Sequence, residues 1–262
     1  MHFITLITDW NKNDFYAGAL KGEILSSCKN VEIVELSNNV KQYNIAEAAF
    51  ILRNSYQHFP LGSIHIIAVN SQTDVDCKLL AAKIDGHYII AADNGIFSLM
   101  GDAEAEEIIE LDVPKDGAKT FPELNVFAPA ACRIAKGDKL SDIGRKVEKI
   151  KNQIPLRATL ENNTITGTVI FIDSYGNVIT NITRDLFDRI GKKRSFEIYV
   201  QSKHYKITKL NQYYPESSSG DLLAIFNSID LLEIAIRNGN AAGLLNLNTD
   251  STIRVEFNTE EK

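Results

Sequence analysis

From residue 2 to about residue 150, short β-rich runs alternate with helical patterns, and this alternation restricts the fold more than any other feature. The β-rich runs are FITLIT, VEIVEL and SIHIIAV. Between them, DFYAGALKGEILSSC and NIAEAAFILRNSYQHF carry apolar residues at every third or fourth position, which is typical of amphipathic helices. Strands that alternate with helices predict an α/β fold with a mostly parallel sheet flanked by helices.

The segment KLLAAKIDGHYIIAA interrupts this alternation. Its Asp85 and Gly86 stand between two apolar runs, and Asp-Gly is a strong signal for a two-residue hairpin turn. Further on, KTFPELNVFAPAA predicts a loop that enters a helix, with Pro129 in the first helical turn. We expect SDIGRKVEKIKNQI, which follows, to form a charged helix.

After this charged segment the pattern changes to short strands separated by turns. The strands that we expect are TITGTVIFID, SFEIYVQ, KHYKITKL, LLAIFN and TIRVEF. Such a series indicates a small antiparallel barrel or sandwich. We therefore predict an N-terminal α/β domain over residues 1–155 and a smaller C-terminal antiparallel β-barrel domain over residues 156–262.

The charge, hydropathy and cysteine spacing of the sequence argue against nucleic-acid, membrane and metal partners. A formal net charge of -6 and a pI near 5.5 provide no basic field for phosphate backbones, so we expect no nucleic-acid binding. MHFITLIT leads directly into an apolar run without a basic leader, and no stretch approaches the roughly 20 apolar residues that span a bilayer. We expect a cytoplasmic protein without a membrane partner. Its cysteines, Cys28, Cys77 and Cys132, lack the pair spacing of a zinc site, which predicts reduced, buried thiols and no metal.

The loops at the carboxyl ends of the strands are the candidate binding segments, because ligands of open α/β sheets bind there. TDWNKNDFYAG carries Asp9 and Asp14, and a carboxylate can accept two hydrogen bonds from a ribose diol. Asp14 is equally well placed to cap a helix N-terminus. ADNGI suits a tight turn. In the second domain, IDSYGNVITNI predicts a hairpin whose Gly turn carries Asp173, Tyr175 and Asn177.

In this order, these segments resemble the S-adenosylmethionine-dependent halide and hydroxide adenosyltransferases, the fluorinase- and chlorinase-like proteins. The resemblance covers nearly the whole chain and rests on ITLITDWNKNDFYAGALKG, FPLGSIHIIAVN, AADNGIF, TFPELNVFAPAA, GTVIFIDSYGNVITNI and NSIDLLEIAIRNGNAAGLL. It implies a central-sheet domain joined to a C-terminal β-barrel. It also implies a homotrimer that binds S-adenosylmethionine, as substrate or ligand and without a further cofactor, between the N-terminal domain of one subunit and the C-terminal domain of its neighbour.

The resemblance assigns ligand-binding roles in the N-terminal domain. Asp9 matches the aspartate that holds the ribose hydroxyls, and Asp14 matches a second polar contact near the methionine end. Tyr43 stands where relatives have an aromatic residue against the nucleoside, although without the family it would be interpreted as a hydrophobic staple at a helix start. Phe121 matches an aromatic wall of the ribose pocket.

Four positions of the C-terminal domain receive roles in the same way. Asp173 resembles the group that holds the methionine amine, and Tyr175 an aromatic lining residue. Asn177 resembles the amide that reads the adenine edge, and Ser228 a hydroxyl near the methionine carboxylate. Carboxylates for an amine and aromatic faces for a sulfonium cation suit this ligand.

The catalytic positions depart from the family pattern. Hydroxide-using members resemble one another in an Asp, Arg and His set, and Asn70, Cys77 and Pro122 stand at those positions here. Asn cannot act as a carboxylate, and Cys cannot provide the permanently charged fork of Arg. Lys78, next to Cys77, adds a cation, but alternation along a strand would direct it to the other face.

Two other residues enter the candidate catalytic set. Thr73 falls where halide-using members have Thr, and Glu123 stands where they keep a small residue. Glu123 can act as a base for water if burial raises its pKa, and otherwise it is a solvated loop glutamate. A carboxylate that points inward would repel a halide.

These resemblances predict an enzyme that cleaves S-adenosylmethionine at C5′ to adenosine and methionine, with Asn70, Thr73 and Glu123 as candidate catalytic residues. Two alternatives remain open. One is a non-catalytic protein that binds or senses S-adenosylmethionine or adenosine. The other is an adenosyltransferase that uses a halide, another nucleophile or another 5′-substituted adenosine.

Overall fold

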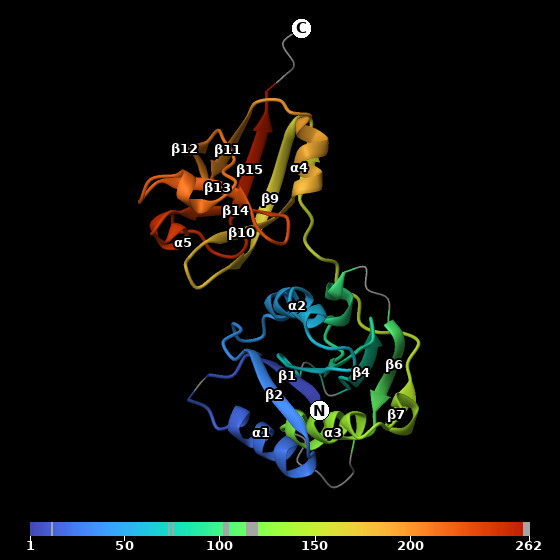
Figure 1. Cartoon of the computed structure of the whole chain (residues 1–262). Coiled ribbons are helices and arrows are strands. Elements are labelled where there is room, and N and C mark those ends of the chain that lie inside the picture. The colour runs from blue at the N-terminus through green and yellow to red at the C-terminus, as the bar shows by residue number, and fades with distance from the viewer. Residues whose placement is uncertain (12, 73, 75, 102–104, 114–119, 259–262) are drawn as a thin grey trace. The chain divides into compact units, whose positions relative to one another are not determined.

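The structure is a computed structural model that describes residues 1–11, 13–72, 74, 76–101, 105–113 and 120–258, with the backbone alone at 202–204. The chain divides into two compact units, Met1–Pro155 and Leu156–Lys262 (Figure 1). Each unit contains its own cluster of buried hydrophobic side chains. Within the described residues, no helix is both long enough and apolar enough to cross a bilayer.

The described part of the N-terminal unit forms a seven-stranded sheet in the order β2-β1-β3-β5-β4-β6-β7. Strands β2, β1, β3 and β5 pair in parallel, and β4, β6 and β7 continue the sheet through antiparallel pairs. This arrangement confirms the predicted mostly parallel sheet. The strands are β1 (His2–Thr8), β2 (Val31–Ser37), β3 (Ile64–Ala68), β4 (Leu79–Ile84), β5 (His87–Ala92), β6 (Ala105–Leu111) and β7 (Gly144–Lys146).

The predicted hairpin joins β4 to β5. Asp85 and Gly86 have φ values of 49° and 76°, and two consecutive positive φ angles are what a type I′ hairpin turn requires. Strands β4 and β5 are therefore antiparallel neighbours inside the sheet. The local Asp-Gly signal was sufficient to predict this pair.

Helices cover both faces of the sheet (Figure 1). On one face, Leu20 and Ile24 pack into the same buried cluster as Ile4 and Leu6 of β1. On the other face, Leu52 belongs to a separate buried cluster. The helices are α1 (Tyr16–Ser27), α2 (Ile45–Arg53) and α3 (Ala128–Ala135), with short 3₁₀ turns at Tyr56–His58, Phe97–Met100 and Leu140–Asp142.

The predicted charged helix over 141–154 is wrong. Residues 144–146 form β7, which pairs with β6, and 147–154 have no regular secondary structure. Val147 and Ile150 pack against the sheet core from this extended segment. Pairing with β6 satisfies backbone groups that a sheet edge leaves open, which outweighs the helical propensity of the charged residues.

The helix predicted after KTFPELNVF is α3, and Pro129 lies in its first turn, as expected. Before it, Glu123–Phe127 form a π-helical turn that continues directly into α3. The sequence analysis did not predict this turn.

The described part of the C-terminal unit is an eight-stranded antiparallel sheet in the order β12-β11-β15-β9-β10-β14-β13, with β8 paired to β9. It is nearly closed and barrel-like, as predicted, and it encloses buried side chains such as Val169, Val178 and Leu232. The elements are β8 (Thr159–Glu161), β9 (Thr164–Ile172), β10 (Val178–Thr183), α4 (Arg184–Gly191), β11 (Phe196–Val200), β12 (Ser202–Ile207), a 3₁₀ turn (Tyr214–Glu216), β13 (Leu222–Phe226), β14 (Leu231–Ile236), α5 (Ala241–Leu244) and β15 (Thr252–Phe257).

Candidate functional site

Asp9 follows β1 directly, and its carboxylate holds two other loops. Its Oδ2 accepts the backbone N–H of Tyr43 at 2.9 Å, in the loop before α2. The same oxygen accepts the backbone N–H of Asn70 at 3.3 Å, in the loop after β3. Since β1 and β3 are parallel neighbours, their carboxyl ends meet, and one side chain gathers three chain segments at this edge of the sheet.

The backbone positions that Asp9 holds have positive φ angles, 64° at Tyr43 and 49° at Asn70. Asn is one of the residues that adopt this conformation at low cost. Asn94, after β5, fixes Asn70 from the other side, because its Nδ2 donates to the Val69 and Asn70 carbonyls at 3.0 and 3.1 Å. The side chain of Tyr43 is 70% exposed, so it does not pack as a hydrophobic staple.

Glu123 is the first residue of the π-helical turn and is only 5% exposed. Burial raises the pKa of its carboxyl group, the negative charge of Asp9 raises it further, and the Ser71 hydroxyl opposes the shift. The interpretation as a solvated loop glutamate is therefore wrong. Single π-helical turns inside helices are frequent at functional sites, and this one places a carboxyl group near that of Asp9.

Neither Pro122 nor Cys77, which stand where hydroxide-using members have His and Arg, has a charged side chain, and the neighbouring Lys78 does not compensate. Pro122 is buried directly before Glu123. Cys77 is half-buried, and its Sγ donates to the Lys78 carbonyl at 3.7 Å. The ammonium of Lys78 lies 3.6 Å from Glu110 Oε2 on β6, so it supplies no cation beside Cys77. Thr73 lies outside the residues that the structure describes.

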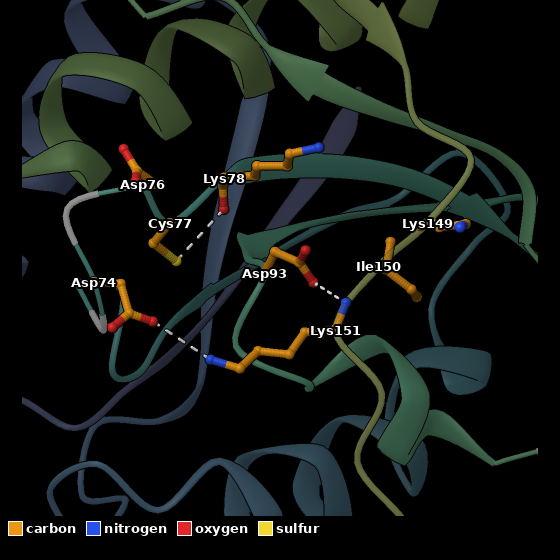
Figure 2. A pocket seen from close by; sticks show the side chains of 8 residues that line it. All are labelled: Asp74, Asp76, Cys77, Lys78, Asp93, Lys149, Ile150 and Lys151. Atoms are coloured by element: carbon orange, nitrogen blue, oxygen red, sulfur yellow. Dashed lines mark hydrogen bonds and ion pairs between the residues drawn. The ribbon is translucent and has the colours of Figure 1, made fainter.

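Cys77 contributes to a groove of about 640 Å³ between the loop before β4 and the segment after β7 (Figure 2). The backbone N–H of Lys151 donates to Asp93 Oδ1 at 2.8 Å, and its Nζ lies 3.5 Å from Asp74 Oδ2. The groove therefore carries charges of both signs, and its lining does not include Asp9 or Glu123. The lining residues are Asp74, Asp76, Cys77, Lys78, Asp93, Lys149, Ile150 and Lys151.

Phe121 belongs to an aromatic cluster. Its ring lies 5.5 Å from that of Trp10 and 5.1 Å from that of Tyr16, both edge to face. Trp10 and Tyr16 are themselves 5.7 Å apart. An aromatic wall therefore stands beside the loop that begins with Asp9. Trp10 directly follows Asp9 in the sequence, which is the signal that could have placed it in the candidate site.

Asp14 does not cap helix α1. The N-cap residue is Phe15, which makes no side-chain cap hydrogen bond. Asp14 is exposed, and its Oδ2 accepts the backbone N–H of Asn11 at 2.9 Å within the same loop. Its carboxylate thus stabilises the loop after Asp9.

In the C-terminal unit, Asp173 and Asn177 close the turn between β9 and β10. Asp173 Oδ1 accepts the backbone N–H groups of Tyr175 and Asn177 at 2.9 and 2.8 Å, and its Oδ2 accepts Asn177 Nδ2 at 3.0 Å. Gly176, with φ of 77°, completes the turn. Asn177 is 8% exposed and Tyr175 is 76% exposed. The turn therefore presents the Tyr175 ring while it holds the two polar side chains in place.

Ser228 is exposed in a different turn, between β13 and β14. Its neighbour Asn227 donates through Nδ2 to Glu233 Oε2 at 3.2 Å, and the Tyr214 hydroxyl donates to Glu233 Oε1 at 2.6 Å. Burial, Glu233 and the charge of Asp173 all raise the pKa of Tyr214. Glu233, 3% exposed, thus connects Tyr214 to the turn that contains Ser228. The signal for it was a lone carboxylate inside the apolar run DLLEIAI.

Several of the predicted site residues thus gather in a polar cluster in each unit. In the N-terminal unit, Asp9 brings Tyr43 and Asn70 together, and Glu123 is within electrostatic range of Asp9. In the C-terminal unit, Asp173 and Asn177 share one turn. Among the described residues, no group of three or more His, Cys, Asp or Glu side chains could hold a metal ion.

The chain is similar in sequence to known proteins over nearly its full length and nearly theirs. The chain is 27% identical to an (R)-S-adenosyl-L-methionine hydrolase of Methanocaldococcus jannaschii, covering 98% of this chain and 97% of the relative. It is 24% identical to a fluorinase of Actinopolyspora mzabensis, with 96% of each chain covered. In fold it is similar to the crystal structure of an uncharacterized conserved protein from Thermotoga maritima, with a TM-score of 0.87 and 24% identity over 96% of this chain and 99% of the other.

Two domain descriptions match most of the sequence. The SAM hydroxide adenosyltransferase N-terminal domain matches residues 4–144. The SAM hydroxide adenosyltransferase C-terminal domain matches residues 167–254. The two matches follow the order of the two compact units, and the chain therefore belongs to the SAM hydroxide adenosyltransferase family.

Proposed function

We propose that this protein cleaves S-adenosylmethionine at C5′ with water, giving adenosine and methionine. The observation that carries the proposal is the buried carboxyl group of Glu123, whose pKa is raised by burial and by the nearby charge of Asp9. Relatives named (R)-S-adenosyl-L-methionine hydrolase match nearly the whole chain. The fold and the order of the sequence segments support the same substrate class.

In the proposed reaction, the water oxygen attacks C5′ in line with the sulfonium, and the C5′–S bond breaks to release methionine. The ionised Glu123 accepts the proton that the water loses. The positive charge of the sulfonium disappears as methionine leaves, and the proton released by the water balances it. A raised pKa makes this carboxylate a stronger base than an exposed glutamate. Asn70 and Thr73 remain candidates for positioning the water, and Asn70 is well suited because Asp9 and Asn94 fix its backbone.

The charges of this cluster disfavour a halide as the nucleophile and tolerate water. The carboxyl groups of Asp9 and Glu123 interact electrostatically, and both would repel an anion brought to the same edge of the sheet. A neutral water does not meet this repulsion. The charge arrangement therefore favours hydrolysis over halide transfer.

The proposed ligand contacts are those implied by the family resemblance. Asp9, Asp14, Tyr43 and Phe121 would bind the nucleoside and the adjoining chain from the N-terminal unit. The C-terminal unit would contribute Asp173, Tyr175, Asn177 and Ser228. We propose a homotrimer in which these sets meet between neighbouring subunits, as the family resemblance implies. Sedimentation analysis that finds only monomers would contradict this assembly.

We further propose that the reaction needs no metal or cofactor and takes place in the cytoplasm. The displacement requires a base and a positioned water, which side chains can supply. Cys28, Cys77 and Cys132 are free thiols, which suits a reducing compartment. Activity that disappears on treatment with a chelator, or a fully extracytoplasmic location on fractionation, would contradict these two statements.

The test is a calorimetric titration with S-adenosylmethionine, with the same mixtures analysed chromatographically for adenosine and methionine. We expect binding together with equal amounts of both products. Glu123→Gln should keep the binding and lose at least about 100-fold in turnover. Glu32→Gln, at an exposed glutamate of β2, is the matched control and should behave like the wild type.

The outcomes separate the alternatives. Binding without either product would make this a sensing or binding protein. Weak binding of S-adenosylmethionine beside tight binding of another 5′-substituted adenosine would indicate a different substrate. Full turnover by Glu123→Gln would remove Glu123 from the mechanism.

A further inference from the structure

Cys28 and Cys132 lie far apart in the sequence and meet in the core between α1 and α3. Cys28 directly follows the last residue of α1, and Cys132 lies inside α3. Their side chains are 3% and 2% exposed and belong to the same buried cluster. Cys77 is only half-buried and lies in the groove described above, so the prediction of three buried thiols is wrong for that residue.

One carbonyl group joins the two cysteines. The backbone N–H of Cys28 donates to the oxygen of Ile24 at 2.8 Å, as expected at the end of a helix. The Sγ of Cys132 donates to the same oxygen at 3.7 Å. The last turn of α1 therefore places the backbone of Cys28 directly beside the thiol of Cys132.

The thiols also interact with each other. Burial raises the pKa of Cys132 to about 12, and Cys28 adds to this shift both by its charge and by a side-chain hydrogen bond. The Cys28 side chain therefore lies next to the Cys132 thiol, in the same buried cluster. At neutral pH the Cys132 thiol is therefore protonated in the closed structure, which slows its reaction with oxidants.

We propose that Cys28 and Cys132 form a redox modification site that a hydroperoxide converts to an intrachain disulfide between α1 and α3. A disulfide needs two side chains that already face each other, because its geometry tolerates little backbone movement. Burial in one cluster, and the Ile24 carbonyl that accepts both the Cys28 N–H and the Cys132 S–H, place the two side chains side by side. Cys77 is outside the pair, since it lines the groove instead.

The chemistry begins when the last turn of α1 opens. Ser27 and Lys29, on either side of Cys28, are exposed, and helix ends are the first parts of a helix to fray. The Cys28 thiolate attacks one peroxide oxygen, the O–O bond breaks, and the sulfur becomes a sulfenic acid while water or an alcohol leaves. The Cys132 thiolate then attacks this sulfur, the S–S bond forms, and the hydroxide that leaves takes up a proton. The two thiols lose two electrons in total, and the peroxide gains them.

The disulfide would connect the two helices that lead away from the candidate site. Helix α1 begins after the loop that contains Asp9, and α3 continues the π-helical turn that begins at Glu123. A bond between the helices restrains their separation. It also closes a long loop in the unfolded chain, which stabilises the folded state.

The first experiment uses full-length protein with Cys77→Ser, which removes the half-buried thiol. The protein is treated with hydrogen peroxide, remaining thiols are blocked with a maleimide, and tryptic peptides are identified by mass spectrometry. We expect a peptide pair linked through Cys28 and Cys132, on a monomeric chain, that dithiothreitol separates. Cys77→Ser combined with Cys132→Ser is the control and should give no such pair.

Two results of this first experiment would overturn the proposal. One is recovery of both cysteines as maleimide adducts or as sulfinic acids after peroxide treatment. The other is a disulfide found only between different chains. Either result would show that the thiols do not react with each other in the folded protein.

A second measurement compares urea unfolding of the Cys77→Ser protein before and after oxidation. We expect the oxidised form to unfold at a higher urea concentration. Peroxide should leave the midpoint of the control with both Cys77→Ser and Cys132→Ser unchanged. A lower midpoint for the oxidised form would mean that the bond strains the fold, which contradicts a pair preformed in the native structure.

Discussion

The carboxylate of Asp9 accepts the backbone N–H of Tyr43 at 2.9 Å, so that a side chain at the end of β1 fixes the loop that enters α2. The same oxygen also accepts the N–H of Asn70. Asp9 therefore has a structural role in addition to the ribose contact that we propose. The two roles can be separated by choosing the substitution.

Asp9→Ala should abolish nucleoside binding and lower the free energy of unfolding by about 1–3 kcal/mol, because two backbone amides lose their acceptor. Asp9→Asn keeps an acceptor oxygen and should preserve more of the stability while it still weakens ribose binding. Calorimetry and urea unfolding measure the two effects. Unchanged affinity in Asp9→Ala would remove Asp9 from the binding site.

The raised pKa of Glu123 predicts how turnover depends on pH. The proposed base is the ionised form, so kcat should rise with pH through a pKa above the ordinary value of 4.5. Burial of an ionised carboxylate also costs stability, and this cost is present above the folded-state pKa. Glu123→Gln should therefore be less active and, at neutral pH, more stable to urea than the wild type. A kcat that does not vary with pH would argue against this base.

The buried histidine pair of the N-terminal sheet predicts a loss of stability in acid. Thr5 Oγ1 lies 2.7 Å from His65 Nδ1, and His65 Nε2 lies 3.3 Å from His87 Nδ1. Burial, and then the charge of His87, lower the pKa of His65 to about 3. Burial also lowers the pKa of His87, with Asp85 opposing the shift.

Both histidines are neutral in the folded protein and titrate near 6.5 when it unfolds. For His65, the contribution to stability is therefore full above pH 6.5 and falls as the pH decreases toward 3, by up to roughly 1.4 kcal/mol per pH unit. The lowered pKa of His87 adds a loss of stability in the same direction. Urea midpoints measured from pH 7.5 to pH 4.5 test this dependence. His65→Gln should reduce the slope, whereas a replacement of the exposed His58 should leave it unchanged.

Pro122→His should not produce rapid hydrolysis by itself. The substitution restores one member of the family set at a buried position, but Asn70 and Cys77 still lack the other charges. Catalytic residues that act together are strongly non-additive. Comparing turnover of Pro122→His with that of the wild type checks this, and a gain of a hundredfold or more would show that the catalytic set has been misassigned.

Glu233→Gln should weaken S-adenosylmethionine binding without removing any direct ligand contact. Glu233 joins Tyr214 to Asn227, the neighbour of Ser228, and Gln can keep only part of this hydrogen bonding. Tyr214→Phe removes one of the same bonds and should have a smaller effect in the same direction. Titration calorimetry measures the affinity and urea unfolding measures the stability of each variant. A displaced turn would lower the affinity alone, whereas general destabilisation would lower both.

Local chemistry was sufficient to predict several elements from the sequence. Asp85 and Gly86 predicted the hairpin because few residues tolerate two consecutive positive φ angles. Pro129 marked the start of α3 because proline fits the first helical turn. The charged segment 141–154 was misassigned because its conformation depends on β6, a strand that is distant in the sequence.

From the sequence we predicted most of the strand and helix order, the family resemblance, and which carboxylates, aromatic rings and thiols could matter. Which of these residues meet depends on the three-dimensional fold. Glu123 became buried near Asp9 because a π-helical turn and parallel strands bring distant segments to one edge of the sheet. Cys28 and Cys132 came together because α1 and α3 cover the same face. Burial and proximity change pKa values and reactivity, and both depend on residues that are neighbours in space and not in the sequence.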